Sequence, residues 1–246
     1  MGETTGIAWA DASMNFWIGC EEVSPGCKNC YAKRLVTGRM AKPFWPPWRT
    51  SPANWAGPAK WVEPKNIFTC SLSDFFLDEP NVNEWRVEAW RIIRKTSWHR
   101  WLILTKRPED IRRFLPDDWG EHGYGNVWLG TSVELQRPYA EHRISELLRI
   151  PAPVHFVSAE PLLGPLDLTG YLGPDKVNWV IVGGESQPGA RPMDPEWARS
   201  LRDQCQYHHA AYFLKQLGGY PNPRDHEQAV LDGRTHTEMP GNSGGT

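Results

Sequence analysis

Cysteine clustering near the amino terminus constrains this 246-residue chain more than any other feature. Three of its five cysteines lie within eleven positions: Cys20, Cys27 and Cys30. Pro25 and Gly26 lie between them and favour a loop, because proline fixes φ and glycine tolerates positive φ. Apolar residues at 14–18 predict a short strand before the loop, and residues 31–40 predict a helix after it. The sequence therefore places three thiols in one loop, where they can surround a single metal centre.

Three thiols in a loop are compatible with more than one kind of site. Zinc takes four ligands in a structural site, or three and an open position in a catalytic one. A [4Fe–4S] cluster normally takes four thiolates, so three would leave one iron open to a small molecule. The loop contains no histidine, and Cys70 and Cys205 are distant in sequence. An iron–sulfur cluster, a zinc site and three free cysteines all stay open at this point, whereas disulfides are not expected without a sign of secretion.

Short apolar runs alternate with helical patterns from residue 66 onward, which is typical of strands buried on both faces of a parallel sheet. After the strand at 14–18, strands are predicted at 67–70, 101–104, 127–129, 154–157, 179–182 and 211–214. Helices are predicted at 81–97, 108–115, 138–149 and 195–208. We therefore expect one α/β domain over residues 1–232, a partial (β/α) barrel of about six or seven parallel strands with crossover helices. A flexible tail is expected at 233–246.

The segment 41–64 is rich in proline and tryptophan and is expected to lack regular structure. It can serve as a strap packed over the domain. Alternatively, its tryptophans can stack against substrate rings.

Polar residues follow six of the predicted strands. In parallel α/β folds the carboxyl ends of the strands build the active site, so these residues are candidates for ligand binding. They are Ser71 and Asp74; Lys106 and Arg107; Ser132 and Glu134; Glu160; Gly183, Gly184 and Glu185; and Lys215 and Gln216.

Several motifs together resemble a phage-encoded three-cysteine-motif family that is radical-SAM-like, that is, similar to enzymes using S-adenosylmethionine (SAM). The motifs are Gly19–Cys20, Val23–Ala32, Leu104–Pro108, Ser158–Leu162, Val182–Ser186 and Phe213–Gln216. The usual spacing in that superfamily is C-x3-C-x2-C, whereas this chain has C-x6-C-x2-C. The resemblance implies a partial barrel of the radical SAM type and a [4Fe–4S] cluster. It also implies reductive cleavage of SAM to a 5′-deoxyadenosyl radical, with flavodoxin or ferredoxin as the electron donor.

The resemblance also suggests roles for individual residues. The metal ligands would be Cys20, Cys27 and Cys30. Cofactor contacts would come from Tyr31, Ser71, Asp74, Ser132, Glu134, Gly183, Gly184 and Glu185. Catalysis would fall to Glu160 and Lys106, and substrate binding to Arg107, Lys215 and Gln216.

Charge and composition bear on partners. The net charge of −2 argues against a chain that binds nucleic acid over its whole surface. Residues 86–113 are nevertheless rich in Arg and Lys and form either a solvated helix face or a patch that contacts phosphates. A nucleobase or nucleic acid is thus the candidate substrate, and the alternative function is a zinc-stabilised nucleic-acid-binding protein without catalysis. No membrane span or signal peptide is expected, and the expected location is the cytoplasm.

Overall fold

The computed structural model describes residues 2–241, and its contacts gather into two compact units. The first unit comprises residues up to Gly130 together with Arg149–Pro153. The second comprises Thr131–Leu148 and the residues from Val154 on. In the described part of the chain, no helix has the length and apolar character needed to cross a bilayer.

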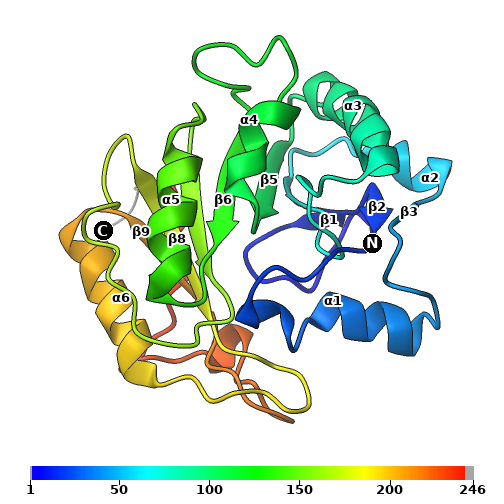
Figure 1. Ribbon diagram of the computed structural model, residues 1–246. Coiled ribbons are helices and arrows are strands. Elements are labelled where there is room, and N and C mark those ends of the chain that lie inside the picture. Colours follow the sequence, from blue (N-terminus) through cyan, green and yellow to red (C-terminus); the bar gives the residue numbers. More distant parts are fainter. Residues whose placement is uncertain (1, 242–246) are drawn as a thin grey trace. The chain divides into compact units, whose positions relative to one another are not determined.

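The first unit contains a parallel sheet with crossover helices (Figure 1). Its main elements are β1 (Ala12–Met14), β4 (Asn66–Thr69), α3 (Pro80–Lys95), β5 (Arg100–Thr105), α4 (Ile111–Phe114) and the start of β6 (Val127–Ser132). Strand β1 pairs in parallel with β4, and β4 with β5. Helix α3 begins where Pro80 occupies its first turn and the Glu79 side chain accepts a hydrogen bond from the Val82 amide, so the sequence itself sets its start.

Two short strands and two short helices surround the cysteine loop in the same unit. They are β2 (Trp17–Ile18), α1 (Tyr31–Arg34), β3 (Trp48–Arg49) and α2 (Pro52–Trp55). Strand β2 pairs with β3 in antiparallel fashion, and this pairing closes the chain around the three cysteines.

The second unit repeats the alternation of strands and helices. Its elements are α5 (Glu141–Leu148), β7 (His155–Ala159), β8 (Val177–Gly183), α6 (Pro195–Tyr207) and β9 (Ala211–Gln216). Strands β7, β8 and β9 pair in parallel. Helix α6 is capped by Asp194, whose carboxylate accepts from the Glu196 amide.

The strand order of the seven-stranded sheet is β1-β4-β5-β6-β7-β8-β9. Each strand therefore neighbours those that precede and follow it within this sheet, and helices occupy most of the crossovers. This order confirms the predicted fold class, a partial (β/α) barrel topology with seven parallel strands and crossover helices.

Aromatic side chains dominate the core of the first unit. Phe16 and Trp101 stack with their ring centroids 5.9 Å apart, and Trp55 meets Phe16 edge-on at 4.8 Å. Because Trp55 is buried and its indole N–H donates to the Phe16 carbonyl, this part of the Pro/Trp-rich segment packs as a strap. Trp45, by contrast, is half exposed.

Two local expectations were wrong. Residues 14–18 do not form one strand, because the buried Asn15 side chain turns the chain between β1 and β2 and binds the Leu72 amide. The segment 41–64 does contain regular structure, since β3 pairs with β2 and α2 is capped by Ser51. The flexible tail expected at 233–246 stays a prediction, and its described part is hydrogen-bonded to β9: the Leu214 amide donates to the His236 carbonyl, and the Glu238 amide donates to the Tyr212 carbonyl. The edge strand thus finds partners for its open backbone groups, and residues 242–246 lie outside the described part.

Candidate functional site

The cysteine loop of the first unit carries three free thiols. Cys20 follows β2, Cys27 ends a short 3-10 turn, and Cys30 precedes α1. All three are partly buried. The side chains of Cys20 and Cys30 pack against an apolar cluster that contains Ile18, Ala32, Val36, Phe44 and Leu72. The loop therefore presents sulfur atoms next to an apolar wall.

The remaining two cysteines are unlike these three. Cys70 and Cys205 are fully buried, whereas the three thiols of the loop are partly exposed. A metal centre could reach a buried thiol only if the core around it rearranged, so these two positions are poor ligands. The distinction agrees with the sequence pattern.

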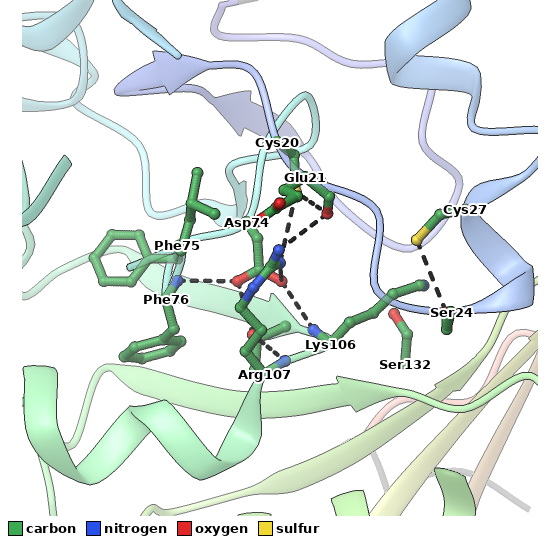
Figure 2. A network of polar contacts seen from close by, with 12 residues as sticks. Cys20, Glu21, Ser24, Cys27, Asp74, Phe75, Phe76, Lys106, Arg107 and Ser132 are labelled. Carbon is green, nitrogen blue, oxygen red and sulfur yellow. Dashed lines mark hydrogen bonds and ion pairs between the residues drawn. The ribbon is translucent and has the colours of Figure 1, made fainter. Parts of the chain in front are cut away.

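Arg107 links the cysteine loop to the end of β5. Its guanidinium donates from Nη1 to Cys20 Sγ at 3.6 Å and from Nη2 to the Glu21 carbonyl at 2.9 Å (Figure 2). Burial and the nearby Asp74 carboxylate raise the pKa of Cys20 to about 12, and the positive charge of Arg107 opposes that rise. Arg107 is thus placed to favour a thiolate at Cys20.

Asp74 is the centre of the polar network in Figure 2. Its Oδ1 accepts from the Phe76 amide at 2.9 Å and from the Thr105 hydroxyl at 2.7 Å. Its Oδ2 accepts from the Lys106 amide at 2.9 Å and from Arg107 Nη1 at 3.4 Å. Both carboxylate oxygens of this buried side chain are therefore engaged, and Asp74 joins the ends of β4 and β5 instead of facing open space.

Two further expected residues lie beside the same loop. The Tyr31 hydroxyl donates to the Ser71 carbonyl at 2.5 Å, and the Ser71 hydroxyl accepts from the Asn15 amide group at 2.9 Å. Tyr31 therefore ties the start of α1 to the residue that follows β4. The Lys106 side chain is partly exposed, and its ammonium has no ion pair among the residues that the structure describes.

In the second unit, Glu160 and Lys215 form a partly buried ion pair, with Nζ 3.0 Å from Oε1. The Ser158 hydroxyl donates to the other carboxylate oxygen of Glu160 at 3.1 Å. These residues come from the ends of β7 and β9. A Cβ added to Gly183, at the end of β8, would lie 2.7 Å from Glu160 Oε1. The absence of a side chain at Gly183 therefore leaves room for the Glu160 carboxylate.

Gly184 and Glu185 are also engaged within the second unit. A Cβ on Gly184 would lie 2.9 Å from the Cα of Gly218, so glycine is needed here for contact with the chain itself. The Gln216 side chain donates to the Gly184 carbonyl. The Glu185 carboxylate accepts from the Arg191 amide at 2.8 Å and pairs with the Arg191 guanidinium.

Ser132 and Glu134 lie at the start of the second unit, where α5 covers them. Arg143 Nη1 donates to the Ser132 carbonyl at 2.9 Å and to Glu134 Oε2 at 2.8 Å. Glu134 is fully buried and paired with Arg143, so its carboxylate is not open to a ligand in this arrangement.

The structure thus assembles two sets of predicted residues, one in each unit. The three cysteines, Tyr31, Ser71, Asp74, Lys106 and Arg107 lie in the first, and the remaining candidates lie in the second. Sequence reasoning did not find two partners, Arg143 and Arg191. Both are ordinary polar residues outside the motifs, and only the fold brings each of them to a carboxylate.

Across residues 2–241, no three His, Cys, Asp or Glu side chains lie close enough together to hold a metal ion as they stand. The donor set nevertheless fits a cluster bound through three cysteines. Three free, partly exposed thiols share a loop that contains no other thiol or imidazole, and an arginine lies beside the first.

The fold and the thiol loop define an α/β protein with a candidate metal site, and comparison places it in a family. The chain belongs to the DUF5131 family, described as proteins of unknown function, whose model matches residues 4–240. No curated protein matches the sequence significantly.

Two solved structures are similar in fold. One is a double mutant of spore photoproduct lyase with bound AdoMet and dinucleoside spore photoproduct, at 12% identity and a TM-score of 0.49, covering 82% of this chain and 75% of that one. The other is a single mutant of the same lyase, at 11% identity and a TM-score of 0.48, covering 81% and 74%. Similarity at this level identifies neither an activity nor a ligand for the present chain.

Proposed function

We propose that this protein is a radical SAM enzyme in which Cys20, Cys27 and Cys30 hold a [4Fe–4S] cluster. The observation that carries the proposal is the loop of three free thiols beside an apolar wall, anchored by Arg107 to the strand-end network around Asp74. When bound, such a cluster supplies the electron that cleaves SAM.

The residues of the first unit have supporting roles in this proposal. Arg107 offsets negative charge at Cys20 and fixes the loop through the Glu21 carbonyl. Asp74 holds Arg107 in place and joins the two strand ends. Tyr31 and Ser71 set the position of α1 relative to β4. Asp74 therefore acts as a positioning residue, and its proposed contribution to cofactor binding is indirect.

The residues of the second unit divide by accessibility. Glu134 and Glu185 are engaged with arginines, so we assign them to holding strand ends, together with Ser132, Gly183 and Gly184. Glu160 and Lys215 are more accessible than these, and they form a pair that can hold and exchange a proton.

We therefore propose Glu160 as a residue that acts on substrate, with Lys215 and Gln216 as its neighbours. Lys106, whose ammonium is not engaged in the described part of the chain, is proposed for the same role. A nucleobase or nucleic acid is the proposed substrate class, and flavodoxin or ferredoxin the proposed electron donor.

Anaerobic reconstitution with iron and sulfide tests this function. We expect about four irons per chain and a cluster EPR signal that changes when SAM is added. Cys20→Ala, Cys27→Ala and Cys30→Ala should each lose the cluster, whereas the matched control Cys205→Ala should retain it because that thiol is buried in the core of the second unit. One tightly bound zinc per chain, with no reducible cluster, would instead favour a zinc-stabilised binding protein and refute the proposal.

A further inference from the structure

A cavity of about 500 Å³ lies in the first unit between α3, α4 and the segment that follows α4. None of its lining residues belongs to the cysteine loop or to the network around Asp74. Its charged lining residues are Arg86, Arg91, Arg94, Arg113, Asp117 and Asp118. Four cations against two anions leave the cavity positively charged, so its chemistry favours an anion.

Arg86 is the most informative of these residues. Its side chain is only 2% exposed, yet it makes no ion pair in the part of the chain that the structure describes. Its guanidinium donates only to neutral acceptors: the Phe75 carbonyl at 2.7 Å, the Leu77 carbonyl at 2.5 Å and the Asn83 side-chain oxygen at 2.9 Å. Burial lowers its pKa to about 10, and the carboxylates of Asp74, Asp78 and Asp110 oppose that shift from a distance. The acceptors bonded to the guanidinium in the described part of the chain are all neutral, so an anion in the cavity would give this buried charge a direct partner.

The rim of the cavity can supply further contacts. Arg113 pairs with Asp78 at 2.6 Å, and Arg94 pairs with Asp118. Exposed pairs of this kind contribute little free energy, so an incoming anion can replace the carboxylate partners. Arg91 is exposed and has no ion pair among residues 2–241. Val87 adds apolar surface, with half of it exposed.

We propose that this cavity binds the phosphate group of a nucleotide, either free or within a strand. A guanidinium presents paired N–H donors that match the oxygens of a phosphate. The volume falls in the usual range for small-molecule sites and exceeds what one phosphate requires. The remainder of the ligand would lie against Val87 and the partly exposed ring of Tyr124. The site is independent of the proposed cluster.

Binding can be measured on the intact chain, without metal or SAM, by equilibrium dialysis at constant ionic strength. The probes are adenosine 5′-monophosphate, a five-nucleotide single-stranded DNA, adenosine, inorganic phosphate and citrate. We expect the monophosphate to bind and adenosine not to bind. Tighter binding of the oligonucleotide would identify a strand as the source of the phosphate, and equal or weaker binding would identify the free nucleotide. Citrate should bind at least about tenfold more weakly than the monophosphate.

Variants locate the site. Arg91→Gln should weaken binding of the monophosphate by about threefold to tenfold, because it removes an exposed charge-assisted contact. The matched control is Arg112→Gln, which removes an exposed charge on α4 that does not line the cavity. Arg86→Lys keeps the charge but loses the paired N–H donors of the guanidinium, and it should weaken binding by about tenfold or more. If that variant does not fold, Arg91→Gln and Arg113→Gln still test whether the phosphate binds in this cavity.

Three results would overturn the proposal. The first is no binding of either phosphorylated nucleoside probe at millimolar concentration. The second is an equal affinity for citrate and the monophosphate, which would indicate a general anion site. The third is an equal loss of monophosphate affinity in Arg112→Gln and Arg91→Gln, which would indicate that surface charge in general, and not this cavity, binds the probe.

Discussion

Replacement of Asp74 by Asn tests whether the polar network is the structural centre of the thiol site. The side chain keeps its shape, but one carboxylate oxygen becomes an amide nitrogen. If that nitrogen replaces Oδ2, it faces two donors, the Lys106 amide at 2.9 Å and Arg107 Nη1 at 3.4 Å. If it replaces Oδ1, it faces the Phe76 N–H and can only donate, whereas Oδ1 now accepts from that N–H. Either orientation leaves a buried donor unsatisfied.

The magnitude follows from the same contacts. An unsatisfied buried donor costs about 1–3 kcal/mol, and loss of a partner for a buried charge costs about 3–5 kcal/mol. The second value is an upper bound here, because the Arg107–Asp74 distance of 3.4 Å is long and Arg107 keeps its bond to the Glu21 carbonyl. We therefore expect Asp74→Asn to lower the free energy of unfolding by about 2–4 kcal/mol.

Urea unfolding of the metal-free protein, followed by tryptophan fluorescence, measures this change. The matched control is Asp78→Asn, because Asp78 pairs with Arg113 at an exposed position and its loss should cost about 1 kcal/mol or less. If Asp74→Asn unfolds within 0.5 kcal/mol of the unchanged protein, a value set by the usual scatter of surface substitutions, the network does not hold the strand ends together.

Two further changes test the second unit. Gly184→Ala should lower the free energy of unfolding by about 1–3 kcal/mol, because the added Cβ would lie 2.9 Å from the backbone of Gly218. The control is Gly170→Ala, whose added Cβ meets nothing within 4 Å and should have little effect. Equal effects of the two changes would contradict the contact at Gly184. Burial and the nearby Arg234 charge lower the pKa of His236 in the folded state. The neutral imidazole therefore stabilises the folded state above the unfolded pKa of about 6.5, and this stability is lost as the pH falls from about 6.5 toward the lower folded pKa. His236→Gln should reduce that pH dependence in urea unfolding between pH 7.5 and 5.5, and an unchanged slope would assign it to another group.

The strands were predictable because their sequences are short, continuous apolar runs, and six of the seven predicted runs overlap a single parallel strand of the structure. The seventh failed at Asn15, a polar residue inside an apolar run. Its side chain satisfies the backbone of Leu72, 57 residues away, at 2.7 Å. No local pattern shows such a partner, so the break between β1 and β2 could not be found from the sequence.

The candidate site was predictable in its residue types but not in its contacts. Cysteine spacing identified the three thiols of the loop. The approach of Arg107 to Cys20 joins positions 87 residues apart, and the engagement of Glu134 by Arg143 depends on how α5 packs. Several strand-end carboxylates that the sequence predicted as ligand-binding groups are therefore already paired with arginines of the same chain.

The antiparallel pairing of β2 with β3 has a consequence for the effective concentration of the three thiols. The pairing places Trp17 opposite Arg49 and Ile18 opposite Trp48, so the cysteines lie on a loop whose ends are held together. A Cβ on Gly19, directly before Cys20, would lie 2.6 Å from the Phe44 carbonyl. The backbone at Phe44, on the far side of the loop, therefore packs closely against Gly19, which precedes Cys20. Folding therefore already closes the loop, so bringing the three thiols together costs less chain entropy than it would in an open chain. A side chain at position 19 would push the two sides of the loop apart and lower the effective concentration of the thiols.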